Sequence, residues 1–209
     1  IAALPTRCEA KGLWPERRVL TVLVRLAKTD GGSRLIGLMA TLLRVRGRAR
    51  RDVSREWEEK HRALEIWGCG AGRSSSDSAF DRNLEVEVAV RLSQASIIIL
   101  LDLWKCYETV DYRYLLDEAQ QLGYPMVAAW MRVQTFIQPR RTKGYNSVSV
   151  RYASCQGILA GDAQATTPLM FFTLRVLRHS KAMAPTLTPK ALVDDMSKQW
   201  TGEDLGQCK

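Results

Sequence analysis

The sequence is poor in the residues that build metal centres from nitrogen and sulfur ligands. It contains two histidines and five cysteines in 209 residues. The cysteines are scattered, no C-x-x-C pair occurs, and no histidine stands near them at ligand spacing. This pattern argues against a zinc site and favours a reducing intracellular compartment.

Long hydrophobic runs are also missing. The longest strongly apolar run covers residues 95–101, which is far too short to span a membrane, and no secretory signal opens the chain. The hydrophobic content of 46% and the charged content of 25% are ordinary for a globular protein and exclude wholesale disorder. The length suits one large or two small domains with a real core.

Basic residues outnumber acidic ones in two places, and the net charge of +9 is therefore unevenly distributed. Residues 1–62 hold 15 Lys+Arg and 7 Asp+Glu, and their densest part is an arginine run: Arg44, Arg46, Arg48, Arg50 and Arg51. Residues 119–161 contain no acid, and their basic residues are Arg132, Arg140, Arg141, Lys143 and Arg151. Basic surface of this size indicates a polyanionic partner. For any single arginine, a solvated charged surface is the alternative.

The pattern along the chain is typical of an α+β fold. Two apolar stretches, 19–28 and 34–43, flank a turn at 30–32 and predict a β-hairpin. A continuous apolar run at 96–101 predicts a strand buried on both faces, and 147–152 alternates like a strand. Helices are expected at 50–65, from a cap at Asp77 or Ser78 to Leu92, at 111–122, at 126–136 and at 168–177, with a Gly/Ser loop at 68–78 as the best candidate for a boundary.

Carboxylates stand at the ends of two apolar stretches. Asp102 follows the run 98–101, and Asp194-Asp195 follows the short approach 190–193. Carboxylates drawn together at the edge of a core repel one another, and Mg²⁺, which prefers oxygen ligands, relieves that repulsion. Two such ions stabilise the attacking and leaving oxygens of a phosphoryl displacement. Taken singly, each acid could equally be a strand-end cap, a helix cap or a loop residue.

Five blocks of the chain, in order between residues 20 and 196, resemble those of reverse transcriptases. LDLWKCYETVD at 101–111 is similar to the first catalytic block, and LVDD at 192–195 to the second. Between them, GILAGD at 157–162 with PLMFF at 168–172 resembles the glycine loop and helix that hold template and primer. KTDGGSRLIGL at 28–38 resembles the fingers hairpin, and GRSSSD at 72–77 a block of non-LTR retrotransposon and group II intron enzymes.

The resemblance implies a right-hand polymerase fold. Residues 1–95 would form a basic fingers-like subdomain with a β-hairpin and helices. Residues 96–209 would form a palm-like subdomain, an antiparallel sheet backed by helices, that stops before a thumb. The chain starts at Ile1 rather than at methionine and ends soon after Asp195. We therefore expect a fragment of a longer retroelement protein.

The resemblance also implies roles for single residues. Asp102, Asp194 and Asp195 would hold two Mg²⁺ ions, or Mn²⁺, with the backbone carbonyl of Leu103 as a further ligand. The incoming nucleotide would contact four residues: Lys28 and Arg34 at its triphosphate, Tyr107 under its sugar, and Gly161 by close backbone approach. The arginine run would bind the nucleic-acid backbone. As alternatives, Tyr107 would be a core aromatic, Lys28 and Arg34 hairpin-tip charges, and Gly161 a loop glycine.

The implied function is RNA-directed DNA polymerisation. Its partners would be an RNA template, a DNA primer and deoxynucleoside triphosphates, with no membrane partner, in an intracellular and specifically nuclear location. One alternative is a catalytically inactive nucleic-acid-binding remnant, because Leu192 replaces the usual aromatic residue and Ala160 the usual glutamine. An RNA-directed RNA polymerase ranks lower, since Tyr107 stands where such enzymes carry a second aspartate. The oligomeric state is left open.

Overall fold

The computed structural model describes residues 3–15, 19–29, 31–62, 74–192 and 195–203, which form two compact units. The first unit comprises residues 1–54 and 105–168, and the second comprises residues 55–104 and 169–209. Each unit is thus built from two stretches of chain and does not follow the sequential division into 1–95 and 96–209. The assignment of those ranges as fingers and palm stays a prediction.

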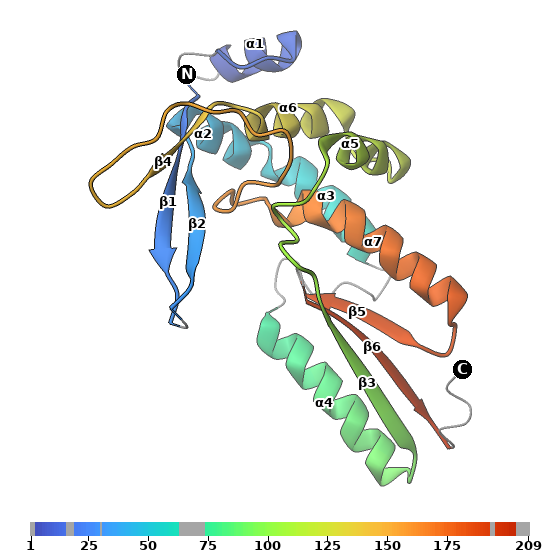
Figure 1. The fold of residues 1–209 in the computed structure, drawn as a ribbon. Helices are drawn as coiled ribbons and strands as arrows, with labels where there is room; N and C mark the ends of the chain where they lie inside the picture. The colour runs from blue at the N-terminus through green and yellow to red at the C-terminus, as the bar shows by residue number, and fades with distance from the viewer. Residues whose placement is uncertain (1–2, 16–18, 30, 63–73, 193–194, 204–209) are drawn as a thin grey trace. The chain divides into compact units, whose positions relative to one another are not determined.

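Helices and strands occur in short runs along the chain, and two small sheets lie among the helices, as in an α+β protein (Figure 1). Unit 1 contains α1 (Ala3–Lys11), β1 (Thr21–Ala27), β2 (Ser33–Leu38), α2 (Thr41–Ala49), α5 (Tyr112–Gln121), α6 (Met126–Phe136) and β4 (Arg140–Lys143). Unit 2 contains most of α3 (Arg51–Arg62), α4 (Ser75–Arg91), β3 (Ala95–Asp102), most of α7 (Thr166–Met183), β5 (Thr188–Leu192) and β6 (Asp195–Gly202). None of the described helices is long and apolar enough to cross a membrane.

The sheet of unit 1 has the order β2-β1-β4. The predicted hairpin is confirmed, because β1 and β2 pair antiparallel in a register that runs from Val22↔Leu38 to Ala27↔Ser33. β4 joins the other edge of β1 in parallel. The second predicted strand, 34–43, was too long: β2 ends at Leu38 and α2 begins at Thr41. Leucine, arginine and alanine favour a helix there, and Leu43 and Arg46 are the buried residues of α2.

Helix α1 was not predicted, and it contributes to the core of unit 1. Cys8 of α1 and the following Trp14 pack with Val19, Leu43 and Met131 in one buried cluster. The indole of Trp14 donates to the carbonyl of Met131 at 3.5 Å. These contacts join α1 to residues far along the chain, which local periodicity does not reveal.

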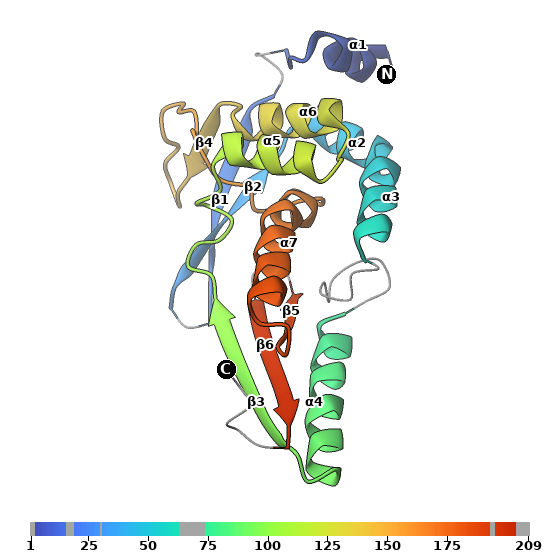
Figure 2. The same ribbon diagram turned by 90° about the vertical axis from the view of Figure 1, so that its right-hand side faces the viewer.

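The sheet of unit 2 is antiparallel with the order β3-β6-β5 (Figure 2). The prediction that residues 96–101 are buried on both faces was wrong. β3 is an edge strand, and Ile99, Leu100 and Leu101 remain 45%, 68% and 41% exposed. Helix α7 supplies much of this unit's buried surface, and its Phe171 meets Trp57 of α3 edge-on at 5.1 Å.

Helix α4 begins slightly before the predicted cap. Its N-cap is Ser74, whose hydroxyl accepts from the backbone N–H of Asp77, while the Asp77 carboxylate accepts from the N–H of Ser74. Asp77 therefore completes a capping box as its third-position acid rather than serving as the cap itself. This box defines where α4 begins, and the first turn of α4 lines a cavity together with the end of β3.

Candidate functional site

Two of the three predicted catalytic carboxylates lie opposite each other across one strand pair of unit 2. Asp102 is the last residue of β3 and Asp195 the first of β6, and they are direct partners in the antiparallel register. Residues opposite each other in such a pair share one face of the sheet, about 4.5–5.5 Å apart at Cα. Leu192, the last residue of β5, is the partner of Asp195 on its other side. The third carboxylate, Asp194, lies outside the described residues.

This carboxylate pair fits a hard divalent cation. Both side chains are exposed, and like charges directly opposite on a sheet are destabilising unless a cation lies between them. Carboxylate oxygens are the ligands that Mg²⁺ prefers, completed by water and substrate phosphates. In the described part of the chain, no group of three His, Cys, Asp or Glu residues is placed to hold a metal. Leu103, the predicted carbonyl ligand, directly follows Asp102 as the chain leaves β3.

A cavity of about 380 Å³ opens beside the carboxylate pair within unit 2. The start of α4 forms one wall with Ser75, Ser78 and Arg82, and the strand ends that carry Asp102 and Asp195 form another. Nε of Arg82 is buried and finds no hydrogen-bond partner among the described residues. Arg82 thus lines the same cavity as the two acids. Sequence reasoning missed Arg82, since nothing in its local pattern separates it from an ordinary helix-surface arginine.

Lys28 and Arg34 flank the tip of the β1–β2 hairpin in unit 1, as predicted. Arg34 is the register partner of Leu26, and the backbone N–H of Lys28 donates to the carbonyl of Gly32 at 2.9 Å across the turn. Both side chains are exposed. The hairpin thus presents two cations at one end, an arrangement suited to a phosphate-bearing ligand.

Tyr107 lies next to the glycine loop in unit 1. The backbone N–H of Ile158 donates to the carbonyl of Tyr107 at 2.7 Å, and that of Gly157 donates to Val110 at 2.8 Å. Tyr107 is half-buried in a turn before α5 and is not part of a helix. The structure therefore brings Tyr107 next to the start of the glycine loop at Gly157 and Ile158.

Gly161 has a packing reason to lack a side chain. Its φ is +102°, and a Cβ placed there would lie 2.7 Å from the carbonyl oxygen of Gly37 and 3.0 Å from Cγ2 of Ile36. The glycine loop is bonded to β2 at the same point, where the N–H of Gly37 donates to Ala160 at 2.6 Å. The close backbone approach that the structure shows at Gly161 is therefore between the glycine loop and the β1–β2 hairpin.

Gly161→Ala is expected to lower the free energy of unfolding by about 2 kcal/mol, because a left-handed backbone strains any residue with a Cβ and the neighbouring atom is backbone. Chemical denaturation of both proteins measures the difference. Gly31→Ala is the matched control: its φ is +82°, yet nothing lies within 4 Å of its Cβ position. Equal losses in the two variants would contradict the packing role of Gly161.

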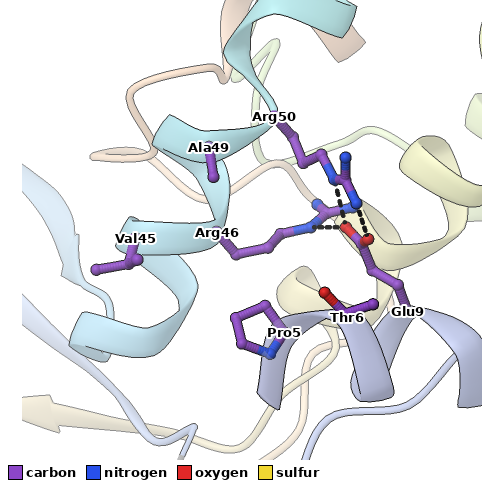
Figure 3. A pocket seen from close by; sticks show the side chains of 7 residues that line it. All are labelled: Pro5, Thr6, Glu9, Val45, Arg46, Ala49 and Arg50. Atoms are coloured by element: carbon purple, nitrogen blue, oxygen red, sulfur yellow. Dashed lines mark hydrogen bonds and ion pairs between the residues drawn. The ribbon is translucent and has the colours of Figure 1, made fainter. Parts of the chain in front are cut away.

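Two members of the arginine run, Arg46 and Arg50, pair with Glu9 of α1 (Figure 3). Arg46 is buried, with only 5% of its side chain exposed, and its Nε donates to Oε1 of Glu9 at 3.0 Å. Arg50 donates to both oxygens of the same carboxylate. These hydrogen bonds, that of Arg50 first, hold the pKa of Glu9 below its ordinary value of 4.5. Desolvation by burial lowers the pKa of Arg46.

Glu9 thus joins α1 to α2 beside a cavity of about 370 Å³, lined by Pro5, Thr6, Glu9, Val45, Arg46, Ala49 and Arg50. Sequence reasoning missed Glu9, which stands in a helix that was itself not predicted. The other members of the run, Arg44, Arg48 and Arg51, are exposed. Arg44 and Arg48 are four residues apart and share one side of α2. These three form the part of the run that is open to a polyanion.

No protein-family model and no curated protein matches the chain. Several solved structures do match the chain. Telomerase from Candida tropicalis, in complex with a TWJ fragment of telomeric RNA, gives a TM-score of 0.62 at 13% identity over 99% of this chain. The corresponding complex from Candida albicans gives a TM-score of 0.59 at 12% identity over 99% of this chain. Apo telomerase from Candida tropicalis, truncated from the C-terminal domain, gives a TM-score of 0.60 at 14% identity over 98% of this chain.

The chain spans less than half of each of these proteins: 40%, 41% and 48% of their lengths, in the same order. At such low identity the likeness concerns the fold and carries no residue-level roles. Telomerase is a reverse transcriptase, and the match extends over nearly every residue of this chain. The chain therefore has a reverse-transcriptase-like fold.

Proposed function

We propose that the chain is the polymerase domain of a retroelement reverse transcriptase, which adds deoxynucleotides to a DNA primer on an RNA template. The observation that carries the proposal is the pairing of Asp102 with Asp195 across β3 and β6, with Leu192 on the other side of Asp195. The two aspartates belong to separate sequence blocks that resemble the catalytic blocks of these enzymes. The reverse-transcriptase-like fold gives independent support for that resemblance. The proposed setting is intracellular and nuclear.

In this proposal, Asp102 and Asp195, together with Asp194 and the carbonyl of Leu103, hold Mg²⁺ or Mn²⁺. The bound cation supplies Lewis-acid stabilisation of phosphoryl oxygens. Arg82 offsets the mutual repulsion of the acids from the side of α4. Lys28 and Arg34 bind the triphosphate of the incoming nucleotide, and the ring of Tyr107 rejects a sugar with a 2′-hydroxyl.

The polymerase proposal is tested by primer extension on an RNA template with the chain as it stands and Mg²⁺. We expect labelled deoxynucleotides to be incorporated, and chelation of the cation to stop incorporation. Ribonucleotides should be rejected, and Tyr107→Ala should relax that rejection. Absence of incorporation under all these conditions would overturn the polymerase assignment.

Nucleic-acid binding is the broader part of the proposal. Two of the similar telomerase structures are complexes with RNA, and unit 1 of this chain exposes Arg44, Arg48 and Arg51 on one segment. Each phosphate contact by such a cation releases counterions from a single strand. Binding of RNA by these residues would therefore depend strongly on salt and little on sequence.

Replacing Arg44, Arg48 and Arg51 by alanine together is expected to reduce the slope of log K against log salt by about 2, since each phosphate contact to a single strand contributes about 0.7. Titration of labelled single-stranded RNA at several salt concentrations measures the slope. A matched triple variant of the exposed cations Arg91, Arg113 and Arg178 should keep the parent slope. If the slope of log K against log salt falls equally in the two triple variants, the α2 arginines have no special role in RNA binding.

A binding protein without catalysis is the second candidate. It is favoured by Leu192 and Ala160, which stand at positions where reverse transcriptases carry an aromatic residue and a glutamine. In that case RNA binding would show the expected salt slope while extension stays absent. Robust extension would exclude this candidate.

A further inference from the structure

A short hairpin at residues 140–152 projects from the sheet of unit 1. Arg140 and Tyr152 exchange backbone hydrogen bonds of 2.8 and 3.1 Å. The N–H of Ser149 donates to Thr142 at 2.9 Å, and the N–H of Gly144 donates to Ser147 at 2.8 Å around the tip. The base of this 140–152 hairpin is part of the sheet, because β4 pairs with β1 (Figure 1). The hairpin is thus held in place at its base and along its length.

The apolar side chains of the 140–152 hairpin are turned to solvent. Tyr145, at the tip, is 100% exposed. Val148 and Val150, at alternating positions, are 56% and 82% exposed, and Tyr152 is 40% exposed. Alternation of this kind normally directs the apolar set toward a core, and here it does the reverse. The segment therefore offers a row of unburied apolar and aromatic groups on a fixed backbone.

The charged residues of the segment that carries this row all have one sign. Residues 119–161 contain no acid. Of their basic residues, Arg132 is buried and paired with Asp162 at 2.8 Å, and Arg140 is also buried. Lys143 and Arg151, both within the hairpin, are exposed. An anionic ligand would complement these two cations.

Exposed aromatic rings beside cations are the combination by which proteins bind single-stranded nucleic acid. Bases stack on the rings and the cations follow the backbone. A duplex buries its bases, so a solvent-facing tyrosine at a hairpin tip gains most from a single strand. A protein partner would need acidic groups and would gain nothing from base stacking.

We propose that the 140–152 hairpin binds single-stranded nucleic acid, with Tyr145 stacking on a base and Lys143 and Arg151 neutralising phosphates. The inference rests on the proposed function in one respect, that the chain binds RNA. It adds a second contact surface, separate from the arginines of α2.

The test uses the whole chain and a labelled oligoadenylate of about 12 nucleotides, a length within the range of known single-strand sites. Tyr145→Ala is expected to weaken binding about tenfold, since a stacked base is worth about 1–3 kcal/mol, and to leave the salt slope unchanged. Lys143→Ala with Arg151→Ala should reduce the slope by about 1.4, because each contact contributes about 0.7. Tyr114→Ala, which removes an exposed tyrosine of α5, should bind like the parent.

An abasic oligonucleotide of the same length separates stacking from charge: the parent and Tyr145→Ala should bind it equally. If Tyr145→Ala binds oligoadenylate as tightly as the parent while the α2 arginine variant loses slope, the hairpin proposal fails and nucleic-acid binding stands. If the parent itself shows no salt-dependent binding, both fail. If the hairpin variants lose binding only to an acidic protein, the surface belongs to a protein partner and the proposal is overturned.

Discussion

Asp102→Asn is expected to lower RNA-templated primer extension about 10³-fold, because Lewis-acid stabilisation by a bound cation is worth several kcal/mol and each 1.4 kcal/mol or so is a factor of ten. Asn keeps the shape of the side chain and one oxygen but removes its charge. Extension rates at saturating Mg²⁺ measure the effect. Asp195→Asn should behave in the same way, since it is the register partner of Asp102 across the strand pair.

The same substitution is expected to raise the denaturation midpoint when divalent cations are chelated. Without a cation, Asp102 and Asp195 are like charges directly opposite on a sheet, and neutralising either one relieves that repulsion. Asp81→Asn is the matched control, because Asp81 is an exposed acid on α4 of the same unit. A variant that loses both activity and stability would indicate a structural role for Asp102. Unchanged extension would remove the carboxylate pair from the chemistry.

Glu9→Gln is expected to lower the free energy of unfolding by about 2 kcal/mol, since removing one charge of a partly buried ion pair leaves the charge of the buried Arg46 uncompensated. The exposed fractions of the Arg46 and Glu9 side chains are 5% and 11%, so solvent can replace the lost partner only in part. Urea denaturation of parent and variant measures the loss. Arg50→Ala should cost much less, because Arg50 is 47% exposed and Glu9 keeps Arg46.

The pH dependence of this stabilisation follows from the pKa of Glu9, which lies lower in the folded chain than its ordinary value of 4.5. A carboxyl with a depressed pKa stabilises the fold above its ordinary value, and that contribution is lost as the pH falls through the lowered one. The Gln variant should therefore differ from the parent at neutral pH and converge with it in acid. Replacing the pair together, as Glu9→Leu with Arg46→Met, should recover much of the loss at neutral pH. Equal instability of the single and double variants would show that the charge pair is not the cause.

The elements fixed by local pattern were predictable. The β1–β2 hairpin follows from two apolar stretches around a Gly-Gly turn, and the starts of α5 and α6 follow from Asp111 and Pro125, which are their N-cap residues. The end of β3 at Asp102 was also located. In each case the signal lies within a few residues of the feature it predicts.

Features that depend on distant partners were not predictable. The burial of β3 was overestimated because strand order, and not composition, makes it an edge strand. The arginine run looked uniform, yet Arg46 and Arg50 pair with Glu9 across 37 and 41 positions of sequence. Arg82 lines the same cavity as Asp102 and Asp195 only because α4 packs against the sheet of unit 2. Composition gives the charge of a segment and says nothing about which of its charges another helix will neutralise.

The register of β6 against β3 also makes strand length a requirement of the site. Successive residues of a strand point to opposite faces, so sliding β6 by one position would bring Met196 opposite Asp102 and turn Asp195 away from it. The backbone hydrogen bonds would re-form after such a slip, and no residue would have changed. A slip of β6 by one residue would therefore separate the two acids as completely as replacing one of them. The site is specified by a count of residues as much as by their identities.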